Sequence, residues 1–329
     1  MPAGRRPFLA ASAAVLACAV PGARAQPGGG ATWPSRPVRL VVPYAAGGGT
    51  DILARALAEA LRPSLPHPIV VENRAGAAGV VGSEAVARAE PDGHALLAVV
   101  STHVMNRHTM AQLPYDPVRD FAPVAMLTRN SMVLVTGTTQ PFSDLPGMLE
   151  HARREPGRIG TGSTEALSSF LGQELSRRAG GLETPDIQYR SGGQLMNDIV
   201  AGHLPVGWTS TASVTPHLPT GRVRVLAVAG ATRTPFFPET PTLAEAGIAG
   251  ITLAGWVALL GPAGLPAAIA DRLHALLVPV FADAGFRQRL DALGIEPDLR
   301  PAAALGAEMR REDAFWAAMA RSGNLKPAG

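Results

Sequence analysis

The sequence predicts an α/β protein with two doubly wound lobes, joined by two crossing strands, and a ligand cleft between the lobes. Short apolar runs alternate with helical patterns along most of the chain, which is typical of parallel sheets with helices on both faces. The chain has 329 residues, more than one hydrophobic core usually serves, so two lobes are expected. A proline-rich, irregular stretch over residues 114–123 separates two blocks of this alternation.

Residues 33–127 and 230–329 are predicted to form the first lobe. Its opening strand, the apolar run 40–42, ends at Pro43, and three glycines lead from it to a helical pattern over 52–61. The other elements predicted for this lobe are strands over 69–72, 95–100 and 251–260, and helices over 82–89, 267–281, 286–293 and 302–322.

Residues 128–229 are predicted to form the second lobe, inserted within the first. The runs 124–127 and 132–136 are interpreted as the crossing into this lobe, and the apolar strand 223–229 as the return crossing. Such an insertion gives a hinge that suits closure on a ligand. Within the lobe, strands over 158–162, 187–189 and 205–208 are expected to alternate with helices over 145–154, 167–178 and 194–201.

Residues 1–25 are predicted to be a signal peptide for export to the periplasm. The basic start RRPFL, from Arg5, is followed by an apolar run over 8–17 and by the small-residue cleavage site Ala23-Arg24-Ala25. The paired arginines also fit a twin-arginine signal, so both export routes stay open. Cys18, the chain's single cysteine, would leave with this segment or, in an alternative interpretation, anchor a lipoprotein.

Charge argues against a nucleic-acid partner. The chain has 29 Lys and Arg against 26 Asp and Glu, but three of the arginines lie in the predicted signal peptide. The mature chain is therefore predicted to be neutral overall. It also has no basic run with interleaved aromatic residues, which is the usual footprint of nucleic-acid binding.

The turn over Tyr44–Asp51 is the first candidate site, because it joins a strand to a helix N-terminus. Such N-termini offer unpaired N–H groups and a partial positive charge to a carboxylate or phosphate. A Cβ at Gly48 is expected to meet the ligand or to force φ out of a glycine-only region. The alternative is an ordinary βα turn with permissive glycines, and no Walker A or G-x-G-x-x-G pattern supports a nucleotide. The candidate ligand-binding residues here are Tyr44, Gly47, Gly48, Gly49, Thr50 (which fits the N-cap position) and Asp51.

Further candidates follow other predicted strands, where ligands bind in parallel sheets. Thr102 and His103 come directly after the strand 95–100. His103 is open to three interpretations: a ligand contact, a general base or a hydrogen-bonded structural histidine. In the second lobe, small hydroxyl residues and one acid follow the strands; the candidate ligand-binding residues are Ser163, Thr164, Glu165, Ser168, Thr209 and Ser210.

A series of ordered motifs resembles the Bug family, the periplasmic TctC-like substrate-binding components of tripartite tricarboxylate transporters. The resemblance runs from Trp33 to the C-terminus and is specific for the family, though not for one ligand. It rests on WPSRPVR from Trp33, VVPYAAGGGTD from Val41, VENRAG from Val71, AEPDG from Ala89, LPYDPVRDFAPV from Leu113, PTLAEAG from Pro241, and Trp256 with GPAGLP from Gly261.

The resemblance implies a type II periplasmic-binding-protein fold. A monomer without a cofactor would bind a small carboxylate and deliver it to membrane transporter subunits. One ligand loop would be Tyr44–Asp51 and the other would lie within 160–169. The chain departs from the family in the second loop, where Phe170 stands in place of a histidine, and at Thr209-Ser210, where the family usually has Asp-Asn. Glu165, if it faces the cleft, would favour a ligand bearing an amino group over a poly-anion.

An enzyme and a sensor are the alternative function classes. The sequence has no G-x-S-x-G elbow and no H-E-x-x-H motif. His203, His217 and His274 lack metal-ligand spacing, so neither catalysis nor a metal is expected. A ligand-presenting partner of a membrane signalling protein would share this fold, and the sequence leaves transport and sensing both open.

Overall fold

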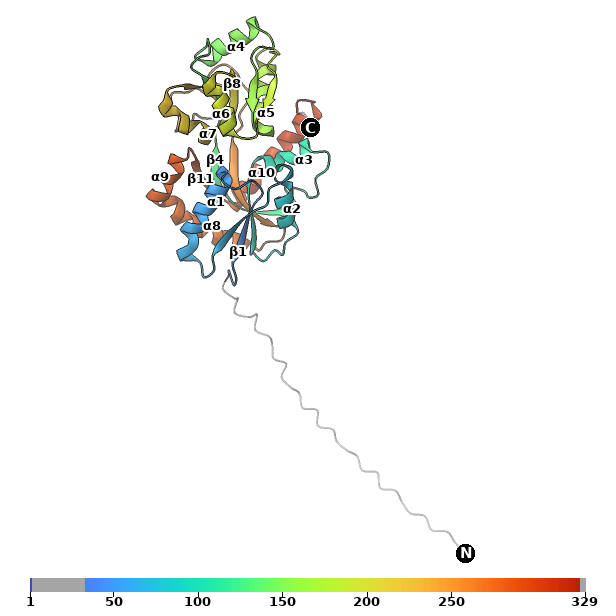
Figure 1. The fold of residues 1–329 in the computed structure, drawn as a ribbon. Coiled ribbons are helices and arrows are strands. Elements are labelled where there is room, and N and C mark those ends of the chain that lie inside the picture. The colour runs from blue at the N-terminus through green and yellow to red at the C-terminus, as the bar shows by residue number, and fades with distance from the viewer. Residues whose placement is uncertain (2–32, 326–329) are drawn as a thin grey trace. The chain divides into compact units, whose positions relative to one another are not determined.

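The structure, a computed structural model, describes Met1 and residues 33–325 (Figure 1). Two β-sheets organise residues 33–325: a six-stranded sheet with the order β11-β4-β10-β3-β1-β2 and a five-stranded sheet with the order β7-β6-β8-β5-β9. This two-sheet α/β architecture confirms the predicted fold class. Apart from Met1, the predicted signal peptide, with Cys18, lies outside the described residues. The predicted lobe boundaries stay a prediction.

The first sheet is parallel at one edge and antiparallel at the other. β1 (Val38–Val42) pairs in parallel with β2 (Ile69–Asn73) and β3 (Ala95–Val100). β10 (Gly255–Pro262) runs antiparallel to β3 and to β4 (Phe121–Asn130), and β11 (Glu296–Pro301) closes the edge against β4.

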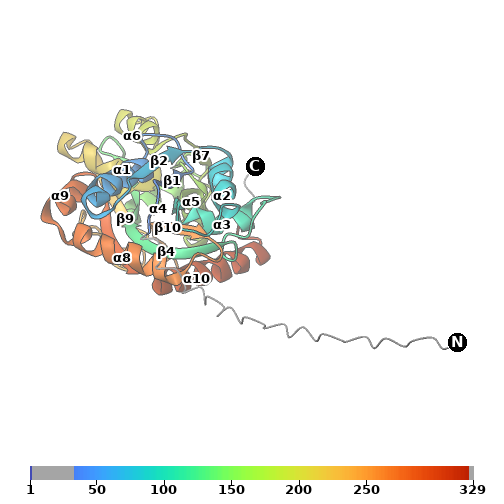
Figure 2. The same ribbon diagram turned by 90° about the horizontal axis from the view of Figure 1, so that it is seen from below.

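Helices cover both faces of this sheet because its strands are apolar on both sides. Along β1, Leu40 packs into one core and the next residue, Val41, into another, as the two-residue period of a strand requires. One core holds α1 (Gly49–Leu61), α8 (Ala267–Ala282) and α9 (Ala284–Ala292); the other holds α2 (Val80–Ala87), α3 (Thr102–Thr109) and α10 (Ala302–Arg321) (Figure 2).

The second sheet repeats this arrangement with a shorter set of elements, coloured green to yellow in Figure 1. Its strands are β5 (Met132–Gly137), β6 (Thr161–Ser163), β7 (Asp186–Gln188), β8 (Val206–Ser210) and β9 (Val223–Val228). The core on one face contains residues of α4 (Leu145–Arg154) and α5 (Ala166–Arg178), and the core on the other contains residues of α6 (Gly192–Ala201) and α7 (Thr211–Val214). Short 3₁₀ turns occur at η1 (Arg62–Ser64), η2 (Ala77–Gly79) and η3 (Thr215–Thr220).

The two sheets are connected twice, and only the first connection is a direct continuation of strands. Ser131 alone separates β4 of the first sheet from β5 of the second. The return differs from the prediction, because β9 pairs with β5 within the second sheet and does not cross. The chain comes back through residues 229–254, which contain no further helix or strand before β10.

Among the strands and the α-helices longer than four residues, α3 and β11 were not predicted, and each has a physical reason. α3 buries the polar side chains of Thr102, His103 and Asn106 beside its apolar ones, which hides the helical hydrophobic period. β11 contains Pro297 and Pro301, and an edge strand can hold proline because one side of it needs no ladder hydrogen bonds. Within the described residues, none of the helices has both the length and the apolar character that crossing a membrane requires.

Candidate functional site

Asp51 holds together the turn between β1 and α1. Its carboxylate accepts hydrogen bonds from the backbone N–H of Gly47 at 2.8 Å and from Asn73 Nδ2 at 2.9 Å, and it pairs with Arg55 at 3.0 Å. Burial by itself would raise the pKa of Asp51, but these hydrogen bonds from Arg55, Gly47 and Asn73 hold it below its ordinary value. Asp51 is therefore an ionised residue whose charge is already compensated by its own neighbours.

The start of α1 differs in two details from the sequence prediction. The N-cap is Gly48 and not Thr50, which lies in the first turn with its side chain buried. Gly48 has φ −75° and ψ 164°, an extended conformation open to any residue, so the expected glycine-only backbone at this position is wrong. The glycine that needs a left-handed conformation is Gly47, with φ +81°.

A cavity of about 400 Å³ lies beside this turn and is closed on its other side by the start of α5. Its lining comes from four parts of the chain: the β1–α1 turn, η2, the end of β3 with α3, and the β6–α5 turn. The lining residues are Tyr44, Gly48, Gly49, Thr50, Asp51, Ala78, Val100, Thr102, Asn106, Thr164, Glu165 and Ala166.

Three helix N-termini meet at this cavity. α1 begins at Gly49, α3 at Thr102 and α5 at Ala166, and all three residues line the cavity. The first N–H groups of a helix have no partner within the helix, and the dipole adds partial positive charge there. The cavity therefore presents several neutral donors suited to an anion, although its described lining contains no Lys, Arg or His.

Tyr44 and Asn106 contribute neutral polar groups to the cavity lining. Tyr44 is half-buried, and its Oη accepts a hydrogen bond from the backbone N–H of Val100 at 3.3 Å. Burial raises the pKa of the Tyr44 phenol well above its ordinary value, so it stays neutral. Asn106 Nδ2 donates to the carbonyl of Ala78 at 3.2 Å, which ties η2 to α3.

Glu165 is the one charged residue that the second sheet's side contributes to the described lining. It occupies the N-cap of α5, and burial raises the pKa of its carboxyl to about 6. Ser168 supports this helix start: its Oγ accepts from the N–H groups of Thr164 and Glu165, each at 3.0 Å.

The structure separates the predicted site residues into two groups. Eight of them line the cavity: Tyr44, Gly48, Gly49, Thr50, Asp51, Thr102, Thr164 and Glu165. The remaining six do not: Gly47, His103, Ser163, Ser168, Thr209 and Ser210.

His103 lies in the interior on α3, 2% exposed. Its Nε2 hydrogen bonds to the carbonyl of Pro117 at 3.2 Å, and its ring stacks on Tyr115 with 5.6 Å between centroids. Burial lowers the pKa of His103 to about 4, so the imidazole is neutral. Of its three interpretations, this geometry favours the structural histidine.

The hydroxyl residues outside the lining are engaged in other contacts or lie within strands. Ser163 donates to Asp186 Oδ1 at 2.6 Å and accepts from Gln188 Nε2 at 2.7 Å. Thr209 is buried within β8, and Ser210 Oγ lies 3.4 Å from Ser213 Oγ.

Sequence reasoning missed four lining residues: Ala78, Val100, Asn106 and Ala166. Val100 and Ala166 could have been found, because they occupy a strand's carboxyl end and a helix start. Ala78 carried no signal, since it adopts a left-handed conformation, φ 51°, without being glycine. Asn106 depended on α3, which the sequence did not reveal.

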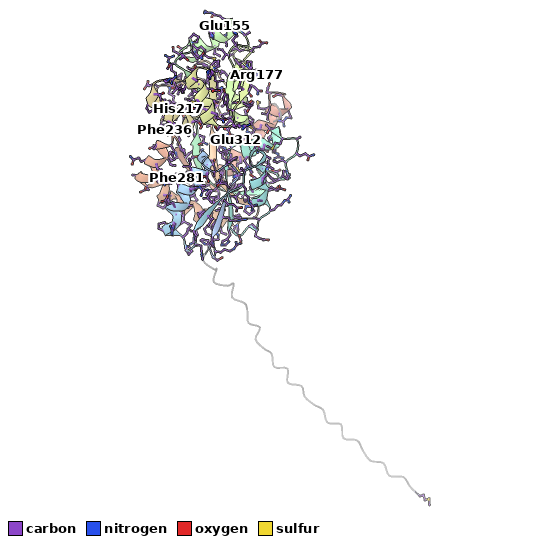
Figure 3. All side chains as sticks on the ribbon, in the orientation of Figure 1. Glu155, Arg177, His217, Phe236, Phe281 and Glu312 are labelled. Carbon is purple, nitrogen blue, oxygen red and sulfur yellow. The ribbon has the colours of Figure 1, made fainter. Side chains whose placement is uncertain are left out.

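A second cavity, of about 450 Å³, lies among β4, β10, β11, α10 and the segment that returns to β10. It is lined by Glu312, a buried acid on α10 that Figure 3 labels, and by paired arginines and acids that include Arg300 and Asp298. None of the predicted site residues lines it.

Comparisons with known proteins agree with this architecture. The family model described as the tripartite tricarboxylate transporter family receptor, TctC, matches residues 53–307. A UPF0065 protein of Bordetella bronchiseptica is 30% identical over 314 residues, which are 95% of this chain and 92% of that protein. BugT of Bordetella pertussis is 33% identical over 237 residues, 71% of this chain and 72% of BugT.

Three solved structures share the fold over almost the whole of their chains. The periplasmic binding protein BugD is 29% identical with a TM-score of 0.77, covering 90% of this chain and 100% of its own. MatC of Rhodopseudomonas palustris, with bound malate, is 28% identical with a TM-score of 0.76, covering 88% and 100%. Rpa4515 of R. palustris, with adipate, is 26% identical with a TM-score of 0.80, covering 90% and 100%.

These matches confirm the resemblance to the Bug family that the sequence motifs indicated. Since the family model spans most of the chain, the protein belongs to the TctC family of tripartite tricarboxylate transporter receptors, which includes the Bug proteins.

Proposed function

We propose that this chain is a periplasmic solute-binding protein that takes up a small carboxylate in the cavity between α1 and α5 and passes it to the membrane subunits of a transporter. The observation that carries the proposal is the meeting of three helix N-termini at one cavity. Such N-termini bind carboxylates through backbone N–H groups without a basic side chain.

The affinity available from such donors is sufficient for a transport receptor. A hydrogen bond to a charged group contributes about 1.5–3 kcal/mol, and a micromolar dissociation constant corresponds to about 8 kcal/mol. Several N–H groups around one carboxylate would reach that range. The volume of about 400 Å³ lies at the small end of ligand cavities, which run from about 300 to 1,000 Å³, so the ligand is a small molecule.

Two relatives support the ligand class. MatC carries malate and Rpa4515 carries adipate, both small dicarboxylic acids. They share this chain's fold over their full length, and the TctC family to which the chain belongs is named for carboxylate transport. We extend to this chain only the class of ligand, small carboxylates, and neither malate nor adipate itself.

Binding is coupled to movement of two lobes, 33–127 with 230–329 and 128–229. The cavity is lined from both sides, by Gly48–Asp51 and by Thr164–Ala166. The single residue between β4 and β5, Ser131, is one hinge candidate, because hinges are a few positions at element ends. A ligand that contacts both sides would stabilise the closed arrangement.

Native mass spectrometry of the protein purified from the periplasm tests the proposal. We expect a single chain that begins near Gln26 and carries a bound carboxylic acid, and calorimetry with that acid should give micromolar or tighter binding. N-terminal sequencing of the same sample locates the cleavage site. Recovery of neutral sugars only, with no binding across a panel of mono-, di- and amino-carboxylates, would contradict the carboxylate assignment.

A further inference from the structure

We propose that Glu165 makes this receptor selective for amino-carboxylates, ligands that carry a protonated amine as well as a carboxylate. The carboxylate would lie at the start of α1 and the amine would lie against Glu165. This inference rests on the proposed function and narrows its ligand class from carboxylates in general to zwitterionic ones.

The first argument is the asymmetry of the two facing helix starts. At α1, the one nearby acid, Asp51, points back into its own turn and is compensated by Gly47, Asn73 and Arg55. The N–H groups of the first turn are therefore available to an anion. At α5, the N-cap position carries Glu165 itself, and a carboxylate at a helix N-terminus uses the favourable dipole there. A second anion at this end would meet a negative charge.

The second argument is the charge of the cavity. Thr164, Glu165 and Ala166 line it from the α5 side, and the described lining contains no basic residue. Within residues 33–325, Glu165 forms no ion pair, whereas Asp51 does. Glu165 is half-buried, and its carboxylate accepts from the backbone N–H of Ser168 in the capping box of α5. Because a partly desolvated carboxylate is stabilised by a nearby cation, a ligand ammonium would supply the charge that the described lining lacks.

The third argument concerns the protonation state of Glu165. Burial raises the pKa of its carboxyl to about 6, which leaves it mostly ionised at neutral pH. A bound ammonium group would favour the ionised form further. A dianion would instead have to bind beside this negative charge, or force Glu165 to take up a proton. Glu165 therefore distinguishes two ligands of the same length by the group that lies against it: an ammonium is favoured and a second carboxylate is disfavoured.

Two pairs of compounds with matched carbon skeletons test the selectivity. Aspartate differs from malate by an ammonium group in place of a hydroxyl, and 6-aminohexanoate differs from adipate by a terminal aminomethyl group in place of a carboxyl group. Titration calorimetry of the full mature protein at pH 7 should show, in at least one pair, the amino compound binding tenfold or more tightly. In Glu165→Gln this preference should fall at least tenfold, because affinity for the amino compound drops while affinity for its partner is unchanged or improved.

The control variant is Glu155→Gln, which removes an exposed acid at the C-cap of α4, labelled in Figure 3. It changes the net charge as Glu165→Gln does and should leave the preference intact. Melting temperatures of both variants verify that they fold.

The outcomes separate this inference from the proposed function. If neither amino compound binds the wild type tenfold more tightly than its counterpart, or if Glu165→Gln keeps the preference, the amino-carboxylate inference is overturned while the carboxylate function stands. If none of the four compounds binds, the inference is overturned as well, and native mass spectrometry decides separately whether any carboxylate is the ligand.

Discussion

Trp256 Nε1 donates a hydrogen bond of 2.8 Å to Glu312 Oε1 and so joins β10 to α10 in the interior. Glu312 is 8% exposed, and its other oxygen, Oε2, has no hydrogen-bond partner among the described residues. Burial raises the pKa of Glu312 to about 8, with Glu308 adding to the rise while Trp256 and Arg311 oppose it. The charged groups that line the same cavity are Arg129, Asp298, Arg300, Glu308 and Arg311.

Glu312 should make the protein less stable as the pH rises toward 8. Its pKa in the folded protein, about 8, lies above the ordinary value of 4.5, so folding favours the protonated form. This contribution is fully present below pH 4.5 and is lost as the pH rises through 8. A pKa difference of one between the folded and unfolded protein corresponds to about 1.4 kcal/mol, so the loss is on the order of a few kcal/mol. Urea unfolding of the wild type and Glu312→Gln between pH 5 and 8.5 measures it.

Glu312→Gln keeps an oxygen for Trp256 and removes the titrating group. We expect this variant to have a flatter dependence of unfolding free energy on pH than the wild type, while the exposed-acid variant Glu155→Gln keeps the wild-type slope. Parallel curves for the wild type and Glu312→Gln would show that Glu312 does not titrate in this range.

Gly47 and Gly48 are adjacent, but substitutions at them should change different properties. A side chain at Gly48 should weaken ligand binding, whereas a side chain at Gly47 should lower stability. Gly48 lines the cavity in an extended conformation, and an added Cβ there would lie 3.4 Å from the carbonyl of Ala45, an ordinary contact. Gly48→Thr also supplies a good N-cap residue. We therefore expect stability within about 0.5 kcal/mol of the wild type, with ligand affinity reduced tenfold or more because the side chain fills part of the site.

Gly47→Ala is the matched control. Gly47 has φ +81°, and nothing lies within 4 Å of an added Cβ, so the variant introduces backbone strain without a clash. A non-glycine residue in this conformation costs about 1–2 kcal/mol. Melting temperature should fall while affinity per folded molecule is kept. An unchanged dissociation constant in Gly48→Thr would remove the β1–α1 turn from the binding site.

Asp51 should stabilise the turn most strongly at neutral pH. The hydrogen bonds from Arg55, Gly47 and Asn73 outweigh its burial and lower its pKa below the ordinary 3.8. Its contribution is therefore present above pH 3.8 and is lost as the pH falls further. Asp51→Ala leaves Gly47, Asn73 and Arg55 without this acceptor; because Gly47 and Arg55 are exposed and can bond to water instead, we expect a cost of about 1–3 kcal/mol. Chemical denaturation at pH 7 and pH 3 checks both statements.

The informative comparison is between those two pH values. The disadvantage of Asp51→Ala should be smaller at pH 3 than at pH 7, because Asp51 of the unfolded wild-type chain takes up a proton as the pH falls below 3.8. Asp92, whose pKa is also lowered and whose carboxylate pairs with Arg36 and binds the N–H of His94, lies outside the cavity lining. Asp92→Ala should therefore leave ligand affinity unchanged, whereas Asp51→Ala should weaken binding by disordering the turn.

The sequence predicted the fold, and the β1–α1 turn beside the candidate cavity, for reasons that are local. The run from Leu40 to Leu61 contains a buried strand, a glycine turn and a helix in immediate succession, and each part is recognisable from composition and period. The same holds for α4, whose predicted bounds agree with the structure. Local patterns of this kind do not depend on what the element packs against.

The direction of polar side chains could not be predicted in the same way. Ser163 and Thr164 are adjacent at a strand end, yet Ser163 bonds to Asp186 while Thr164 lines the cavity. His103 follows Thr102, and only Thr102 reaches the cavity. These differences arise from α3 and β7, whose contacts join residues far apart in the sequence, so a single sequence without its tertiary partners cannot supply them.

Phe170 and Trp316 should contribute jointly to stability across the two sheets. Phe170, on α5, meets Trp316, on α10, edge to face with 5.0 Å between ring centroids, and both are buried. Phe170→Leu keeps a large apolar side chain and should cost less than a buried Phe to Ala change, which costs about 3–5 kcal/mol, and the lost edge-to-face contact should appear as about 0.5–1.5 kcal/mol of coupling. Phe170→Leu, Trp316→Leu and the double variant, unfolded in urea, form the cycle that measures this coupling.

Ligand affinity in these variants tests whether the contact also positions the site. Phe170 lies on α5 a little more than one turn beyond Glu165, so its packing against α10 fixes where the start of α5 faces the cavity. We expect Phe170→Leu to weaken ligand binding several-fold at a temperature where the variant is fully folded. Phe281→Leu, which changes a buried ring that packs with Phe286 in the core around α8, should lower stability but not affinity. If both variants bind as the wild type does, the ring pair stabilises the fold without positioning α5.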